Sequence, residues 1–285
     1  MNPDLMTCCV CGHEAAPAET ANVHPNVRAF ASETFTVWRC GGCGSIHALE
    51  DVDLPHYYAQ YPFFRQTMDF ALRMAYRNLT RRLKHCGIRP PMRLLDFGCG
   101  SGLLTDFFRA RGFDAVGYDP YSKTHNDPAV LDEPFDILVA QDVIEHAPDP
   151  LAMLKQFDSH VRPGGYIVIG TPNASGISLD PVGHHVHPLH QPYHRHILSR
   201  EGLDAATSDL GWTQTAYYKT PYTNMFLLSL PFIHHLMDHF DSTIDVLFDR
   251  PKSTRFWLSP KTWGLFLAGR WRCDDADILA IYQKT

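Results

Sequence analysis

A glycine-rich turn near residue 100 could hold a nucleoside-like ligand. The sequence DFGCGSG places Asp96 just before the alternating glycines Gly98, Gly100 and Gly102. Glycine lets a ligand approach the backbone closely, and the free N–H groups of a following helix point toward that ligand. Asp119 lies about twenty residues further on, where a carboxylate can accept hydrogen bonds from both ribose hydroxyls. The pattern therefore predicts a nucleoside-binding site.

The spacing of the glycines indicates which ligand is bound. A nicotinamide fingerprint needs a third glycine in the pattern G-x-G-x-x-G, and Leu103 takes that position when the pattern starts at Gly98. The actual pattern, Asp96 followed by G-x-G-x-G, resembles the first motif of the class I S-adenosylmethionine-dependent methyltransferases. The resemblance implies S-adenosyl-L-methionine as the cofactor. A glycine turn without a ligand is the structural alternative.

Four cysteines near the N-terminus form two C-x-x-C pairs, Cys8 with Cys11 and Cys40 with Cys43. Thiolates at this spacing suit tetrahedral zinc, and four of them leave no position open for a substrate. We therefore expect a structural Zn²⁺ in a zinc ribbon, with disulfide pairing as the alternative that a reducing compartment disfavours. Metal binding of about 10–16 kcal/mol would replace the core that so small a module lacks. Cys9 is a spare thiol.

A histidine-rich segment, GHHVHPLHQPYHRHILS, could supply a catalytic base. Methyl transfer from a sulfonium needs a positioned acceptor and a group that removes its proton, and the ordinary histidine pKa of about 6.5 suits that removal. His194 is the first candidate, His190 the second, and His146 a third. The segment holds six histidines: His184, His185, His187, His190, His194 and His196.

Two alternatives stay open for these histidines. His194 could only fix the loop before a helix for which Ser199 is the expected N-cap. Imidazoles at short spacing also chelate metals, so His184, His185, His187 or His190 could hold a second metal.

The elements that must position these residues follow an alternating pattern of strands and helices. We expect strands at 94–96, 114–118, 135–140, 166–170, 213–218 and 278–283, with helices at 68–87, 103–112 and 151–160. The pattern predicts an α/β fold, and the resemblance implies a Rossmann-like seven-stranded methyltransferase sheet, here with an N-terminal zinc ribbon and a helical insertion near the C-terminus. The segment between the second and fourth strands is short, so the third strand should be reduced to about 129–131.

Two further stretches make the resemblance specific. FDILVAQDVIEHAPDP and RPGGYIVIGTPN resemble strand segments of a methyltransferase subfamily with a D-V-x-E-H motif, over about 93–212. Some relatives carry a four-cysteine zinc ribbon, including deoxysugar C-methyltransferases, whose large C-terminal domain is not expected within these 285 residues. Tyr193-His194 resembles their segment with the proposed base. The resemblance also implies which residues bind the cofactor: Asp96, Gly98, Cys99, Gly100, Gly102, Asp119, Pro120, Gln141 and Asp142.

Composition limits the function classes. The chain has 285 residues, 45% of them hydrophobic, and a formal charge of −6, which disfavours a nucleic-acid partner because phosphate binding leaves a basic footprint. No signal peptide or membrane-spanning stretch is expected, so we predict a cytoplasmic protein. The predicted units are a ribbon at 1–50, an aromatic and helical connection at 51–91, the cofactor-binding domain at 92–220, and the insertion with the last strand at 221–285.

Three functions are compatible with these patterns. The leading hypothesis is methylation of a small-molecule acceptor, with oxygen favoured over carbon. A zinc-ribbon RNA methyltransferase is the second, and a non-catalytic binding protein that retains the fold is the third. The apolar segment at 221–273 could pack as part of the core, form a homodimer interface, or cover an apolar substrate as a lid.

Overall fold

A mixed sheet of six strands forms the centre of the molecule, in the order β11-β12-β9-β8-β6-β7. This computed structural model describes residues 5–180, 182, 187–223, 229–249, 251–272 and 277–285. The strands are β6 (Arg93–Phe97), β7 (Asp114–Tyr118), β8 (Phe135–Gln141), β9 (Val161–Pro172), β11 (Trp212–Tyr218) and β12 (Asp277–Lys284).

The first four of these strands are parallel, and the C-terminal pair makes the other end of the sheet antiparallel. β6 pairs with β7 and β8, and β8 pairs with β9, all in parallel. β12 runs antiparallel to both β9 and β11. The carboxyl ends of the parallel strands therefore meet at one edge, where open α/β sheets bind ligands.

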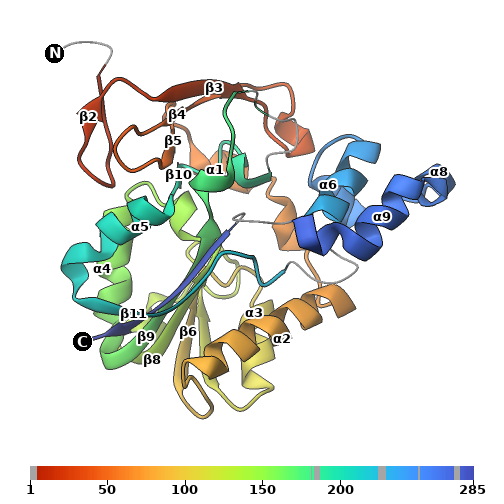
Figure 1. Cartoon of the computed structure of the whole chain (residues 1–285). Coiled ribbons are helices and arrows are strands. Elements are labelled where there is room, and N and C mark those ends of the chain that lie inside the picture. The colour runs from red at the N-terminus through yellow and green to blue at the C-terminus, as the bar shows by residue number, and fades with distance from the viewer. Residues whose placement is uncertain (1–4, 181, 183–186, 224–228, 250, 273–276) are drawn as a thin grey trace.

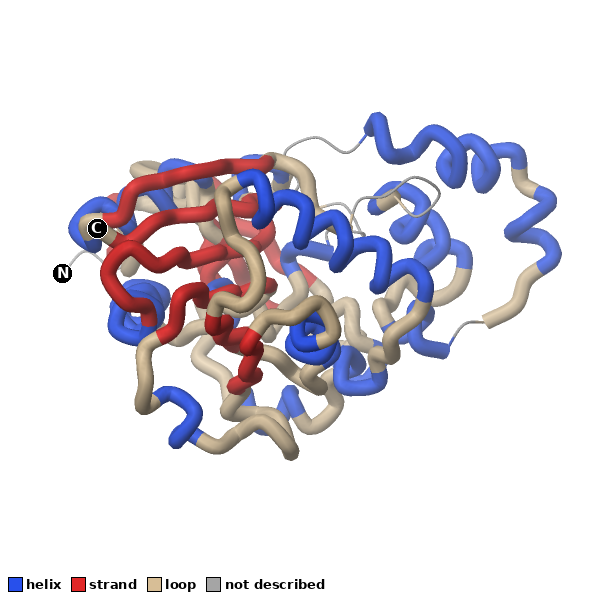
Figure 2. Tube along the Cα trace, turned by 90° about the horizontal axis from the view of Figure 1, so that it is seen from below, coloured by secondary structure: helices blue, strands red, loops and turns tan. Residues whose placement is uncertain are grey.

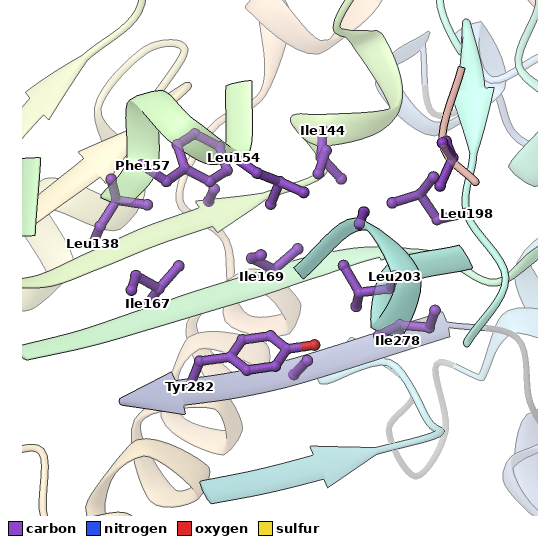
Figure 3. Packing of buried hydrophobic residues seen from close by; sticks show 14 of the residues in the cluster. Leu138, Ile144, Leu154, Phe157, Ile167, Ile169, Leu198, Leu203, Ile278 and Tyr282 are labelled. Carbon is purple, nitrogen blue, oxygen red and sulfur yellow. The ribbon is translucent and has the colours of Figure 1, made fainter. Parts of the chain in front are cut away.

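Helices cover both faces of the sheet (Figure 1). On one face, Leu154 and Phe157 of α4 (Pro150–His160) and Leu203 of α5 (Arg200–Thr207) pack in one cluster with Leu138 and Ile167 (Figure 3). On the other face lie α2 (Phe70–His85) and α3 (Leu103–Arg109), whose apolar side chains pack against the opposite side of the same strands. Burial on both faces explains the continuous apolar runs of the central strands.

The sequence predicted a sheet of seven strands, whereas the described part of the chain forms a sheet of six. The chain position of the third expected strand holds a short 3₁₀ turn, η3 (Pro128–Leu131), whose N-cap Asp127 accepts from the Ala129 N–H. The segment between β7 and β8 is too short for both a helix and a strand. β7 is consequently the edge strand.

The N-terminal ribbon is completed by a strand from the second half of the chain. Its sheet has the order β10-β5-β4-β3, with β3 (Glu19–Val23), β4 (Phe35–Arg39), β5 (Ile46–Ala48) and β10 (His196–Ile197). A separate pair, β1 (Met6–Thr7) and β2 (Glu14–Ala15), flanks the turn that contains Cys8, Cys9 and Cys11. Val37 and Ile46 of the ribbon share a core with Ile177, Leu189 and Ile197. The ribbon is thus packed into the rest of the molecule.

The remaining helices extend to one side of the sheet (Figure 2). α1 (Leu54–Tyr58) belongs to the aromatic connection, and the expected insertion contains α6 (Leu230–His239), α7 (Asp245–Asp249), α8 (Thr254–Leu258) and α9 (Pro260–Ala268). Residues 224–228, 250 and 273–276 lie outside the described part of the chain. None of the described helices has both the length and the apolar character needed to cross a membrane.

Candidate active site

The glycine turn follows β6 and is tied back to β7. The Gly98 N–H donates to the Tyr118 carbonyl at 2.7 Å, and the Cys99 N–H donates to the same oxygen at 3.3 Å. Gly98, Gly100 and Gly102 have φ values of 76°, 55° and 80°, in the left-handed region that favours glycine. α3 begins directly after Gly102. The strand, turn and helix expected from the sequence are all present.

Two carboxylates flank this turn and differ in exposure. Asp96 is 2% exposed, accepts from the Thr105 hydroxyl at 2.7 Å, and has its pKa raised by burial to about 7. Asp119 is half-buried; its Oδ2 accepts from the Gly100 N–H at 2.9 Å and its Oδ1 from the Tyr121 N–H at 2.8 Å. Asp96 supports the turn from inside, whereas Asp119 is accessible beside its backbone.

The turn leaves open space at Gly100. A Cβ added there would meet no other atom within 4 Å. A Cβ on Gly98 would lie 2.4 Å from Val143 Cγ2, and one on Gly102 would lie 2.5 Å from the Nε2 atom of His125. The backbone around Gly100 is therefore the part that a ligand can approach, with Asp119 next to it.

The other expected cofactor-binding residues lie at the strand ends around the turn. Gln141 ends β8 and lies against Gly170, while Pro120 is exposed after Asp119. Asp142 is exposed and has a φ of 54°, a conformation that residues other than glycine rarely adopt. Such strained backbone conformations concentrate at functional sites.

Glu145, His146 and His194 form a buried cluster at the end of β8. The ligand-type atoms of these three residues lie within 4.8 Å of one another. The Nδ1 atom of His194 is 2.5 Å from the Pro188 carbonyl, so Nδ1 carries the hydrogen and Nε2 is a bare acceptor. That Nε2 lies 4.0 Å from Glu145 Oε1, which has no hydrogen-bond partner among the described residues.

Burial disfavours charge on all three groups. It raises the pKa of Glu145 well above its usual value, while Thr171 donates to the other carboxylate oxygen at 3.0 Å. Burial lowers the pKa of His146 to about 4. Burial and the neighbouring His146 lower the pKa of His194 well below 6.5. His194 is therefore an unprotonated imidazole at neutral pH, which is the form that accepts a proton.

Aromatic contacts connect this cluster to the glycine turn. The Tyr58 hydroxyl is 2.8 Å from His146 Nδ1, and the His146 and His194 rings are 4.8 Å apart. Tyr58 also stacks on Tyr121 at 4.4 Å, and the Tyr121 backbone binds Asp119. A continuous chain of contacts thus runs from Asp119 to His194.

The other two catalytic candidates are held in structural contacts. The Tyr193 side chain is wholly buried, and its hydroxyl donates to the Tyr57 carbonyl at 2.9 Å. His190 is 3% exposed, stacks on Tyr193 and hydrogen bonds to Asn26. His184 and His185 lie outside the described residues, as does the side chain of His187.

The four ribbon cysteines converge in a separate cluster. The sulfur atoms of Cys8 and Cys43 are 3.8 Å apart, and those of Cys11 and Cys40 are 3.7 Å apart. A tetrahedral metal with Zn–S bonds of about 2.3 Å has sulfur–sulfur edges of about 3.8 Å. The cluster therefore has the donor set and the separations that one zinc ion requires.

Sequence comparison identifies the family. A profile described as "Methyltransferase domain" matches residues 68–243, well over half of the chain. The chain belongs to this methyltransferase family. The match contains the glycine turn, Asp119 and the Glu145, His146 and His194 cluster, so the expected family is confirmed.

Two curated relatives are similar to this methyltransferase over part of its length. Ubiquinone biosynthesis O-methyltransferase from Cereibacter sphaeroides is 35% identical over 103 residues, 29% of this chain and 42% of that protein. The protein of the same name from Rhodopseudomonas palustris is 31% identical over 126 residues, 37% of this chain and 50% of that protein. The chain thus spans half or less of the curated relatives it matches.

Among solved structures, the cyclopropane synthase MmaA2 from Mycobacterium tuberculosis is 16% identical, with a TM-score of 0.43. The aligned part is 73% of this methyltransferase and 84% of that chain.

The sequence did not single out two residues of this site, Glu145 in the cluster and Tyr58 beside it. Glu145 was visible only as the neighbour of His146 in the D-V-x-E-H stretch, and its proximity to His194 depends on a contact between distant segments. Tyr58 was one of several tyrosines in the connection, and the sequence carries no signal that selects it. The expected N-cap Ser199 is confirmed, because its hydroxyl accepts from the Gly202 N–H at 2.8 Å.

Alanine substitutions at two glycines of the turn should distinguish the cost of a steric clash from the cost of a positive φ. Gly100→Ala adds a Cβ to open space at positive φ and should lower the free energy of unfolding by about 1 kcal/mol. Gly98→Ala adds a clash with the stiff Val143 side chain and should cost about 2–4 kcal/mol. Denaturant unfolding checks the order. Equal losses for the two variants would contradict this packing of the turn.

Proposed function

We propose that this protein transfers a methyl group from S-adenosyl-L-methionine to an oxygen atom of a small-molecule acceptor, most simply a phenolic or enolic hydroxyl. The observation that carries the proposal is the contact chain from Asp119 to the unprotonated Nε2 of His194. The name of the two curated relatives supports oxygen as the acceptor atom. Carbon is the nearest alternative acceptor, because the same base could remove a proton from an activated carbon.

The glycine turn and the two strand ends would hold the cofactor. Asp119 would accept hydrogen bonds from the ribose hydroxyls, and the open backbone at Gly100 would lie against the nucleoside. Asp142 and Gln141 would line the same edge of the sheet. When bound, S-adenosylmethionine supplies a methyl group on a positively charged sulfur, which needs no further activation.

His194 would act as the general base. Its Nδ1–H is held by the Pro188 carbonyl, which fixes the ring and leaves Nε2 to take the acceptor proton. The positive charge that then forms on the ring lies 4.0 Å from the Glu145 carboxyl group. Because burial keeps the Glu145 carboxyl neutral, its Oε1, unpartnered among the described residues, would act as a hydrogen-bond acceptor for the new Nε2–H rather than as a negative charge. His146, His190 and Tyr193 would position the base and close the site to water.

The ribbon would hold one structural Zn²⁺ through Cys8, Cys11, Cys40 and Cys43. The sulfur separations match a closed tetrahedral site, so this metal would have no open position for substrate. Its role would be to keep β5 in place, because β5 pairs with β10, which begins two residues after His194.

The helices α8 and α9 would form a homodimer interface within the proposed 221–273 segment. Their exposed apolar side chains include Trp257 at 45%, Leu258 at 81%, Trp263 at 47% and Leu267 at 50%. Gathered apolar surface of this kind marks interaction sites on soluble domains.

Asp119→Ala should weaken S-adenosylmethionine binding about 10- to 100-fold, because it removes a charged acceptor worth about 1.5–3 kcal/mol. Calorimetric titration measures this affinity. Asp114→Ala, at the exposed opposite end of β7, is the matched control and should bind as the wild type does. Unchanged affinity of the Asp119 variant would remove Asp119 from the cofactor site.

His194→Asn distinguishes a base from a residue that only fixes the loop. Asparagine retains an N–H for the Pro188 carbonyl but cannot take a proton, so turnover of a phenolic acceptor should fall about 10²- to 10⁴-fold. Cofactor affinity should be unchanged, and His85→Ala, on an exposed position of α2, should remain fully active. An active His194→Asn enzyme would assign His194 a structural role.

The pH profile tests the same assignment independently. Since burial lowers the pKa of His194 well below 6.5, the base remains unprotonated as the pH falls through 6.5. The acidic limb of kcat/KM should therefore lie well below pH 6.5, measured where circular dichroism shows the protein folded. A limb centred at 6.5 would mean that an exposed histidine is the base.

A further inference from the structure

A second group of metal-type ligands lies beside the ribbon cysteines and is unused by the proposed reaction. Cys9 Sγ lies 3.7 Å from His196 Nδ1 and 4.0 Å from His47 Nδ1. The two Nδ1 atoms are 2.9 Å apart. His47 and His196 are directly paired across β5 and β10, so their side chains share one face of the ribbon sheet.

In each ring, the hydrogen-bond partner of the Nε2 atom shows whether that nitrogen carries the hydrogen. His47 Nε2 is 3.3 Å from Cys8 Sγ, and a metal-bound thiolate can only accept, so this Nε2 carries the hydrogen. His196 Nε2 is 3.2 Å from the Pro148 carbonyl, which also only accepts. Both Nδ1 atoms are therefore left as bare acceptors that face each other.

Two lone pairs at 2.9 Å repel unless a proton or a metal ion lies between them, and burial lowers the pKa of both histidines, which disfavours the extra proton. Ligating histidines commonly donate their other N–H to a carbonyl or a similar acceptor, which is the arrangement of both rings here. Cys9 supplies a thiol on the same side, and the Asp149 carboxylate adds negative charge near Cys9 and His196. All these features favour a divalent cation at this point.

We infer that Cys9, His47 and His196 bind a second zinc ion, with the fourth coordination position open to solvent. One sulfur and two imidazole nitrogens form a borderline-soft donor set that suits zinc and excludes calcium and magnesium. A tetrahedral zinc with these ligands has sulfur–nitrogen edges of about 3.6 Å and a nitrogen–nitrogen edge of about 3.3 Å. The sulfur–nitrogen separations of 3.7 and 4.0 Å and the nitrogen–nitrogen separation of 2.9 Å lie within about 0.4 Å of these values.

The ions in the two sites would have different surroundings. The four-cysteine site is closed and largely buried, whereas Cys9 is exposed and His196 half-buried. The second metal would join the ribbon to β10 two residues after His194, and a water or an added ligand could complete its coordination. The hydrogen assignment on His47 rests on the proposed ribbon zinc, so the experiment must detect the two sites separately.

The test is a zinc count on the intact protein after incubation with excess zinc and removal of unbound metal by gel filtration. Wild type should hold two zinc ions per chain by atomic emission, and Cys9→Ser and His196→Asn should each hold one. Cys86→Ser, which removes a half-buried thiol outside both clusters, is the control and should hold two. In cobalt-substituted protein, Cys9→Ser should leave the thiolate charge-transfer bands of the four-cysteine site unchanged.

The outcomes separate this inference from the ribbon proposal. One zinc in wild type that persists in Cys9→Ser would overturn the second site, would leave the ribbon zinc intact, and would mean that the two rings share a proton. Two ions in Cys9→Ser would also overturn it. One zinc in wild type that is lost in Cys9→Ser would support the second site and contradict the ribbon zinc. No zinc in wild type would overturn both.

Discussion

The candidate site depends on the backbone of Arg195, which joins the two halves of the molecule. Its N–H donates to the Glu145 carbonyl at 2.7 Å, and its carbonyl accepts from the Ala48 N–H of the ribbon at 2.9 Å. His194 lies directly before this joint and His196 directly after it. The end of β8 and the ribbon sheet together fix the position of His194, the proposed base, so the ribbon would support a site that lies outside it. Both groups of potential metal ligands contain ribbon residues.

Burial gives the histidine cluster its chemical character. An exposed histidine is partly protonated near neutral pH, whereas His194 and His146 are kept neutral because a buried positive charge is costly. When a hydrogen bond fixes the Nδ1–H of a neutral imidazole, only the Nε2 atom of that ring can accept a proton. Glu145 is neutral as well, and its Oε1, unpartnered in the described part of the chain, lies 4.0 Å from His194 Nε2, where it could accept a hydrogen bond from a protonated ring.

Local patterns predicted the parts of the fold that depend on local sequence. The glycine turn, the strands around it and the N-cap at Ser199 are set by residues a few positions apart, and they appear as expected. The short segment after Asp119 also indicated a reduced third strand, which the structure replaces with a 3₁₀ turn. In contrast, β10 is a two-residue strand whose partner lies about 150 positions away, so neither its existence nor the pairing of His196 with His47 could be read from periodicity. The contacts of Glu145 and Tyr58 have the same long-range origin.

Following the methyl group tests the central claim most directly. Zinc-loaded protein would be incubated with S-adenosylmethionine carrying an isotope-labelled methyl group and a panel of phenolic and enolic acceptors, and the products analysed by nuclear magnetic resonance. The account predicts that the label appears in a methoxy group, together with an equal amount of S-adenosylhomocysteine. A label on carbon or nitrogen would contradict transfer to oxygen. Cofactor binding without transfer to any acceptor of the panel would contradict the proposed acceptor class.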